Sequence, residues 1–218
     1  MPTIIWSGLL RFRFLLPLLA AACAGQPPRE AAPQKPPPAA LAGLPATFAN
    51  TPSCDGCLGI TLTLRPDGAY LVRERVGGSE FYDFGRWSQR PDGLLLEGGR
   101  DAPRRYAVQP DDVLDSLEGT QGGNLKRQAR VEPLRGPFRV VGTYDGALFR
   151  ECRTGLAWTL GDSRPGERLK EEFAEMRGDK RVPASLVAID GRFEAQSGRE
   201  VLVVQRPASL LTGGRCPG

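Results

Sequence analysis

Hydrophobic and polar residues alternate over short stretches of residues 44–130, and turn-forming residues separate these stretches. Residues 60–65 (ITLTLR) alternate for six positions, which is the period-2 pattern of a half-buried strand. The Pro66-Asp67-Gly68 triplet then favours a tight turn, because Pro fixes φ, Asp bonds nearby backbone and Gly accepts positive φ. Further strands are predicted at 69–76, 80–89, 94–97, 106–109 and 113–117. Such spacing of short strands, without a helical stretch, predicts a small antiparallel barrel or sandwich.

Residues 131–218 show a different order of patterns. A helix is predicted from Ser163 as its cap to Gly178 as its stop, with Pro165 in the first turn. Strands are predicted before it at 138–144, 147–152 and 156–161, and after it at 184–195 and 200–205. Three strands, one helix and two strands are the order of a five-stranded OB-type barrel. Because no basic groove with interleaved aromatics accompanies it, we interpret this half as an interaction or stabilising module.

The first 22 residues are predicted to be an export signal peptide. Arg11 and Arg13 supply positive charge, an apolar run follows, and residues 18–23 (LLAAAC) resemble a bacterial lipobox ending at Cys23. Lipidation of Cys23 would anchor the chain to a membrane, whereas ordinary cleavage in this Ala-rich stretch would release a secreted protein. We favour lipidation. Residues 23–43 are then expected to form an extended tether, since residues 26–38 contain six prolines.

The absence of histidine removes several chemistries at once. A chain with no His has no Ser–His–Asp triad, no Cys–His dyad and no His-ligated zinc, iron or copper. The 29 Lys and Arg residues are interspersed with 25 Asp and Glu residues, so we expect no nucleic-acid partner. The acidic pairs at 111–112 and 171–172 are interpreted as solvated charge rather than as a hydrolytic site. We therefore predict no catalytic residues and a protein that is not an enzyme.

Cys54 and Cys57 form a C-x-x-C pair that leaves three interpretations open. A thioredoxin-type site is disfavoured because the flanking residues predict no helix to lower a thiol pKa. A c-type haem site needs His where Leu58 stands, and a zinc site needs two further ligands. The remaining interpretations are a structural disulfide in a tight turn, a copper(I) thiolate pair and a redox-responsive bond.

Cys152 and Cys216 remain once Cys23 and the C-x-x-C pair are assigned. In an oxidising compartment these two pair with each other by default. The bridge would close a loop of about 65 residues and contribute about 4 kcal/mol on the chain-entropy model. A structural role and a redox-sensing role are compatible interpretations of this bond.

Four motifs in residues 44–130 occur together. They are LPATF at 44–48, C-x-x-C-x-G-I at 54–60, LRPDGAY at 64–70 followed by Glu74, and GRW at 85–87. The last resembles the G-x-W element of lipocalin-like barrels, and we interpret Trp87 as closing a core beside a Gly bulge. In combination the four motifs resemble those of the NlpE lipoproteins, a family of outer-membrane lipoproteins associated with copper tolerance and envelope-stress signalling.

The resemblance implies a fold, a location and a set of functional residues. The expected fold is mainly β, with a lipocalin-like antiparallel barrel at 44–130 followed by an OB-like five-stranded barrel with one helix at 131–218. The chain would be exported and lipid-anchored to the outer membrane, facing the periplasm. The family's C-x-x-C falls on Cys54 and Cys57, and its carboxy-terminal disulfide falls on Cys152 and Cys216. Copper and an envelope stress-sensor protein are the cofactor and partner that it implies.

These observations rank three functions. The leading hypothesis is a non-enzymatic envelope lipoprotein of NlpE type, involved in envelope stress or redox sensing and in copper homeostasis. The alternative is a barrel that binds a small apolar ligand, or copper(I) through Cys54 and Cys57. A thiol oxidoreductase comes third, because no activating helix or cation is predicted beside Cys54.

Overall fold

The computed structural model describes residues 41–118, 123–178, 184–206, 208–211 and 214–216. The predicted signal peptide, the lipidation site Cys23 and the tether as far as residue 40 lie outside these residues. The elements below belong to one compact unit, Pro37–Gly218. No helix among the described residues is long and apolar enough to cross a membrane.

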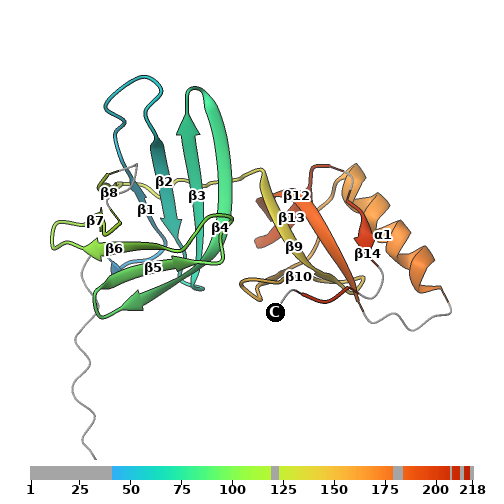
Figure 1. Cartoon of the computed structure of the whole chain (residues 1–218). Coiled ribbons are helices and arrows are strands. Elements are labelled where there is room, and N and C mark those ends of the chain that lie inside the picture. Colours follow the sequence, from blue (N-terminus) through green and yellow to red (C-terminus); the bar gives the residue numbers. More distant parts are fainter. Residues whose placement is uncertain (1–40, 119–122, 179–183, 207, 212–213, 217–218) are drawn as a thin grey trace, which may run out of the picture. The chain divides into compact units, whose positions relative to one another are not determined.

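The first eight strands form a closed antiparallel barrel in which each strand pairs with the next along the chain (Figure 1). The barrel closes where β1 pairs with β8, with Phe48 opposite Arg127. Its strands are β1 (Ala46–Ala49), β2 (Gly59–Leu64), β3 (Ala69–Val76), β4 (Ser79–Arg90), β5 (Gly93–Glu97), β6 (Arg104–Val108), β7 (Val113–Ser116) and β8 (Leu125–Arg127). The predicted antiparallel barrel is confirmed. The closing strands β1 and β8 have only four and three residues, too few for alternation to reveal them.

Strand β2 differs from its prediction, because both of its faces are buried rather than one. Its apolar residues point into the barrel, and the outward Thr61 and Thr63 are 8% and 4% exposed. The hydroxyl oxygens of Thr63 and Thr47 lie 2.8 Å apart, and the Thr47 hydroxyl accepts the backbone N–H of Glu132 at 2.9 Å. The chain that leaves β8 therefore covers the outer face of β1 and β2.

Trp87 closes one end of the barrel by fastening the turn after β2. Its indole N–H donates to the carbonyl oxygen of Arg65 at 2.8 Å. Its backbone N–H donates to the carbonyl oxygen of Gly68 at 2.9 Å. Gly85 is required nearby, since a Cβ there would lie 2.4 Å from the carbonyl oxygen of Glu97. The G-x-W element of β4 thus allows the close approach of β5 and holds the turn after β2.

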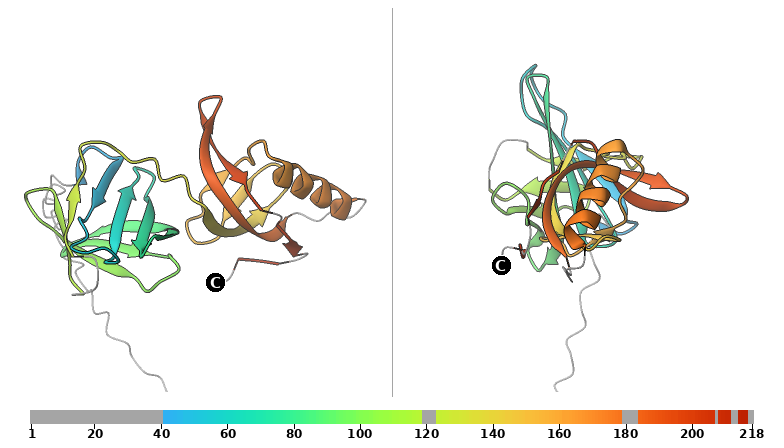
Figure 2. Two further views of the ribbon diagram at one scale, coloured as in Figure 1. Left: turned by 90° about the horizontal axis from the view of Figure 1, so that it is seen from above. Right: turned by 90° about the vertical axis from the view of Figure 1, so that its right-hand side faces the viewer.

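The remaining strands form an antiparallel sheet in the order β11-β10-β9-β12-β13, with β14 paired to β12. They are β9 (Phe138–Tyr144), β10 (Phe149–Glu151), β11 (Ala157–Trp158), β12 (Ser185–Gln196), β13 (Arg199–Val204) and β14 (Leu210–Leu211). An isolated parallel bridge between Leu160 and Leu202 links the two ends of this order. The sheet is curled, β12 and β13 make a long hairpin (Figure 2), and the predicted OB-like order is confirmed.

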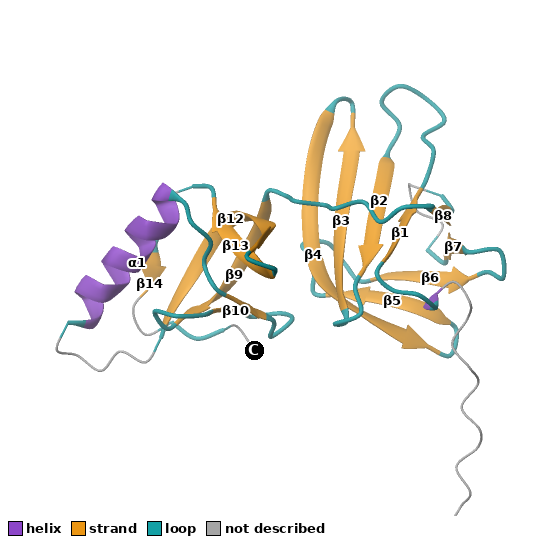
Figure 3. Cartoon of the chain, turned by 180° about the vertical axis from the view of Figure 1, so that it is seen from behind, coloured by secondary structure: helices purple, strands orange, loops and turns teal. Residues whose placement is uncertain are grey.

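Helix α1 (Arg164–Arg177) is the single α-helix of the described ranges (Figure 3). Its cap is as predicted: the Ser163 hydroxyl accepts the backbone N–H of Gly166 at 3.1 Å, and the N–H of Gly178 bonds to the last turn. Leu169 and Phe173 are buried against the sheet. The apolar stripe and the two caps together set the length of the helix.

The strand predicted at 147–152 is shorter than expected, because a side chain accepts the hydrogen bonds of its first backbone N–H groups. The Asp145 carboxylate accepts the N–H groups of Ala147 and Leu148, both at 2.8 Å, so β10 starts only at Phe149. Polar residues that bond local backbone favour turns over strand pairing.

The hydrophobic core consists of two clusters. The first fills the barrel and includes the fully buried Phe48, Leu62, Leu64, Leu94, Leu114 and Leu125. The second contains the sheet residues Trp158 and Phe193, and it also takes Ala69, Leu71 and Phe84 from the outer face of the barrel. The Phe84 ring lies 5.8 Å from that of Trp158 and 5.7 Å from that of Phe193. The predicted limits 44–130 and 131–218 therefore separate two sheets that share a core, and their independence as domains remains a prediction.

Candidate functional site

The Cys54–Cys57 pair lies in the turn between β1 and β2 as a disulfide. Its sulfurs are 2.02 Å apart, and the Cys57 backbone N–H donates to the Cys54 carbonyl oxygen at 3.1 Å. Cys54 is exposed and Cys57 is half-buried. The Ser53 hydroxyl lies 3.6 Å from the Cys57 Sγ. Because the turn itself brings the two cysteines together, the bond closes a loop that is already formed locally.

Asn50 fixes the base of this loop, a role that was not predicted from the sequence. Its Oδ1 accepts the backbone N–H of Ile60 at 2.6 Å, and its Nδ2 donates to the carbonyl oxygen of Leu58 at 2.9 Å. The backbone N–H of Asn50 also donates to the Ile60 carbonyl oxygen at 3.2 Å. An Asn placed between a strand and a Pro- and Ser-containing turn is the signal that could have identified this role.

An open hollow of about 760 Å³ lies beside the loop. It is lined by Cys57 and Leu58 of the loop and by Asn124, Lys126 and Gln128. In the bonded state neither sulfur is a thiolate, so the pair is neither a nucleophile nor a metal ligand. Among the described residues there is no group of three or more Cys, Asp or Glu side chains suited to a metal ion. Metal binding or thiol chemistry here requires the bond to be reduced first.

The thiol-oxidoreductase hypothesis also lacks the expected local structure. The residues that follow Cys57 enter strand β2, whereas the α-helix of the described chain begins at Arg164. A helix N-terminus next to the first cysteine is a principal means of stabilising its thiolate. Cys54 has no such helix.

The barrel interior leaves little room for the apolar ligand considered above. Large apolar side chains fill its centre, and a pocket lined by Leu62, Tyr70 and Val72 has a volume of about 10 Å³. A space of that size holds about one water molecule. Towards one end the interior becomes polar, and the Glu74 carboxylate lies 2.5 Å from the Arg104 guanidinium. Burial lowers the Arg104 pKa, but the hydrogen bond and charge of Glu74 outweigh it and raise this pKa overall.

The Cys152–Cys216 pair is a disulfide in the second half, with sulfurs 2.14 Å apart and Cα atoms 5.3 Å apart. Cys152 directly follows β10, and its backbone N–H donates to the carbonyl oxygen of Val141 in β9 at 2.8 Å. Cys216 is exposed and follows β14. The bond therefore joins a residue fixed within the sheet to a segment 64 residues further along the chain.

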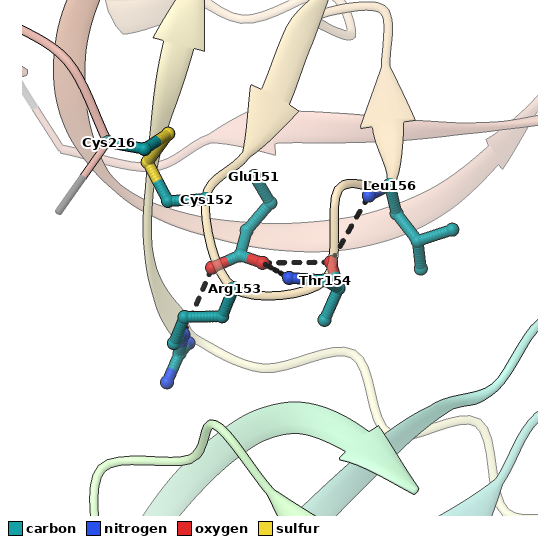
Figure 4. The surroundings of a disulfide bond; sticks show 6 residues. All are labelled: Glu151, Cys152, Arg153, Thr154, Leu156 and Cys216. Carbon is teal, nitrogen blue, oxygen red and sulfur yellow. Dashed lines mark hydrogen bonds and ion pairs between the residues drawn. A yellow bond between two sulfur atoms is a disulfide. The ribbon is translucent and has the colours of Figure 1, made fainter. Parts of the chain in front are cut away.

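Glu151, next to Cys152, is a fully buried carboxylate that the sequence analysis did not identify (Figure 4). One carboxylate oxygen accepts the backbone N–H of Thr154 at 2.6 Å and its hydroxyl at 2.8 Å. The other accepts the Arg153 Nε–H at 3.0 Å. The Thr154 hydroxyl in turn accepts the backbone N–H of Leu156 at 3.3 Å. A single side chain thus shapes the turn that carries Cys152.

The same turn contacts strand β4 of the barrel. The Arg86 guanidinium donates to the carbonyl oxygen of Thr154, with its Nε at 2.9 Å. Arg153 lies 3.8 Å from the Asp83 carboxylate. The environment of the second disulfide is therefore organised by charged and backbone groups, unlike the open loop around the first.

Comparisons with known proteins show weak similarity to solved structures. No protein-family model matches the chain, and neither does any curated protein. Among solved structures, the chain is similar to one described as the Cpx pathway activator NlpE from Escherichia coli. The two are 22% identical with a TM-score of 0.37, and the match covers 79% of this chain and 97% of the other.

Proposed function

We propose that the chain is a non-enzymatic envelope lipoprotein of NlpE type whose Cys152–Cys216 bond reports the oxidation state of the exported protein. Cys23 would carry the lipid that anchors it to the outer membrane, and residues 23–43 would hold the folded part away from the membrane surface. A chain that lacks the bond would be the species that an envelope stress sensor engages.

Three sequence observations support the envelope location. The lipobox-like residues 18–23 precede a Pro-rich tether, and an even number of cysteines remains for pairing. The four motifs in residues 44–130 resemble those of the NlpE lipoproteins. These observations agree with one another because lipidation, tethering and disulfide formation all belong to exported proteins.

The single observation that carries the redox part is the long-range Cys152–Cys216 bond. A loop of this length corresponds to about 4 kcal/mol on the chain-entropy model, which is comparable to the total stability of about 5–15 kcal/mol of a typical domain. The exposed position of Cys216 leaves one end of the bond accessible to thiol reagents. A change in one bond would therefore alter the folded population of the second half.

The proposal is tested by measuring envelope-stress output in cells that export variants at equal levels. Cys152→Ser and Cys216→Ser should each raise the output, whereas the matched Cys54→Ser/Cys57→Ser variant should leave it near the wild-type level. Cys23→Ser tests the anchor, because loss of lipidation should move the chain out of the membrane fraction. Unchanged output in both Cys152 and Cys216 variants would refute the redox role.

Copper(I) binding at Cys54 and Cys57 is the second candidate, favoured by the hollow that reaches Cys57. Soft thiolates select copper(I), and the chain offers no His for a stronger ligand set. Titration of copper(I) into the reduced chain should saturate a site that Cys54→Ser/Cys57→Ser lacks and Cys152→Ser/Cys216→Ser keeps. Equal binding by all three proteins would exclude this site.

A further inference from the structure

Strand β14 covers part of one edge of β12. Leu210 and Leu211 pair with Val187 and Leu186, on the same side of β12 as β13. The backbone N–H of Gln205 donates to the Asp190 carbonyl oxygen at 2.9 Å on that side. Since strand residues alternate in direction, the N–H groups of Leu186 and Ala188 face this edge too. Among the described residues, the edge between Ser185 and Asp190 is therefore covered by the two residues of β14 and, at Asp190, by Gln205.

The residues around β14 show what kind of segment fits this edge. Ala208 and Leu210 are half-buried and pack against the second core, while Ser209 and Leu211 are exposed. On β12 itself Val187 is fully buried. An extended segment with an apolar side chain at every second position therefore matches the edge in both hydrogen bonding and packing.

Two further features hold Gly214 and Cys216, which follow β14, in place. Gly214 packs so closely that a Cβ at its position would lie 2.6 Å from the Leu186 Cβ, and its N–H donates to the Leu211 carbonyl oxygen at 3.3 Å. Cys216 follows and is bonded to Cys152. A two-residue strand is marginal by itself, so the close packing of Gly214 and the disulfide are needed to keep β14 on the edge.

We infer that the Cys152–Cys216 bond acts as a latch for β14, and that the unlatched chain offers the Ser185–Asp190 edge to an extended, alternately apolar segment of a partner protein. This inference rests on the proposed redox function and names the surface through which it would act. The unlatched state arises when the bond never forms, or when a dithiol gives two electrons and two protons to the bond. In the second case two thiols result and the dithiol becomes a disulfide.

A partner protein fits this edge better than a second copy of the chain. A second copy brings the same two-residue strand, which pairs no better than the chain's own β14. The chain's own β14 also has the higher effective concentration, because it is linked directly to β13. A partner strand that spans Ser185–Asp190 would form more pairs than β14 does, and exposed strand edges accept such additions.

Hydrogen exchange and peptide binding on the full chain test the inference together. The amides of Leu186 and Ala188 should exchange at least about tenfold faster in Cys216→Ser than in wild type or in Cys54→Ser/Cys57→Ser. The binding probe is a labelled synthetic peptide of residues 205–211 lengthened by two Val-Thr pairs. It should bind Cys216→Ser at least about tenfold more tightly than the oxidised wild type. The same peptide with the Leu210→Asp change should show no such preference.

Gly214→Val keeps the inference testable if Cys216→Ser fails to fold. Its side chain should displace the segment from Leu186 while both disulfides stay bonded, so the edge should again open and bind the peptide. The inference would be overturned if the amides of Leu186 and Ala188 exchanged at the wild-type rate in every folded variant and the peptide bound all of them equally. A dimer with protected β12 amides would also overturn it, in favour of a second copy as occupant.

The two proposals can fail separately. An edge that opens in Cys216→Ser without any rise in stress output would refute the redox function and leave the latch. A rise in stress output while Leu186 and Ala188 stay protected would refute the latch and leave the function.

Discussion

Cys54 and Cys57 are three residues apart in the sequence and Cys152 and Cys216 are 64 apart, although both pairs form the same kind of bond. On the chain-entropy model the first bond contributes about 2 kcal/mol and the second about 4 kcal/mol. The first closes a turn whose base Asn50 already fixes, whereas the second ties the segment after β14 to the end of β10. Sequence distance thus decides whether a disulfide shapes a loop or holds distant parts together.

The surroundings of the two disulfides also differ, being open around the first and packed around the second. Cys57 faces an open hollow, and its sulfur has a hydroxyl neighbour in Ser53. Cys152 follows the fully buried Glu151, whose carboxylate accepts three hydrogen bonds. Breaking the first bond should therefore be absorbed locally, while breaking the second should affect a packed region.

Removing each bond in turn gives the largest expected contrast. Cys152→Ser/Cys216→Ser should lower the free energy of unfolding by about 4 kcal/mol, and Cys54→Ser/Cys57→Ser by no more than about 2 kcal/mol. Equilibrium urea unfolding followed by Trp fluorescence measures both. Equal losses would mean that loop length does not distinguish the two bonds.

Replacing the buried carboxylate beside Cys152 should have the next largest effect. Glu151→Ala leaves the Thr154 and Arg153 donors without their acceptor, which should cost about 2–3 kcal/mol. The matched control is Glu97→Ala, which removes an exposed ion pair with Arg90 and should cost less than about 1 kcal/mol. Urea unfolding decides the comparison, and a loss in Glu151→Ala no larger than in the control would contradict this account of the turn.

Asn50→Ala applies the same test to the first loop. Loss of its bonds to Ile60 and Leu58 should cost about 1–2 kcal/mol. In a Cys54→Ser/Cys57→Ser background the two losses should not add, because Asn50 and the disulfide restrain one loop. Full additivity in urea unfolding would show that they act independently.

Alkaline pH compares the two halves through their buried tyrosines and should give the smallest effect. Burial is the main cause that raises the pKa of both Tyr70 and Tyr144, and the shift for Tyr70 is large. Such a group stabilises the fold below its unfolded pKa of about 10, and this stability is lost as pH rises further. Between neutral pH and about pH 10.5, the free energy of unfolding of Tyr70→Phe should therefore fall by about 1 kcal/mol less than that of the wild type. The same decline in wild type and Tyr70→Phe would contradict this.

Much of the fold follows from local patterns in the sequence. Period-2 alternation located β2, the Pro-Asp-Gly turn placed β3 after it, and the capping residues Ser163 and Gly178 located both ends of α1. Strands β1, β8 and β14 have two to four residues, too few to show periodicity, whereas the equally short β7, β10 and β11 lie inside longer stretches that were predicted as strands. Length therefore limits which strands can be predicted.

The candidate site was predictable in part for a similar reason. Cysteine counting drew attention to all four sulfurs, since cysteines are few and pair in a limited number of ways. Glu151 and Asn50 carried no such signal, because their roles depend on burial and on backbone groups that only the folded chain brings near them. The shared core of Phe84, Trp158 and Phe193 was likewise invisible, as it joins residues from two separate patterns.

The central claim is that the Cys152–Cys216 bond, and not the Cys54–Cys57 bond, reports oxidation. The most direct measurement follows the oxidation state of the cysteines and the envelope-stress output in one culture. During it, the exporting cell's thiol oxidant is progressively withdrawn. Alkylation of Cys216 and of Cys54 is quantified by mass spectrometry beside envelope-stress output. The account predicts that output rises in proportion to the reduced fraction of Cys216, with or without Cys54→Ser/Cys57→Ser. Output that stays flat while Cys216 becomes fully reduced would contradict it.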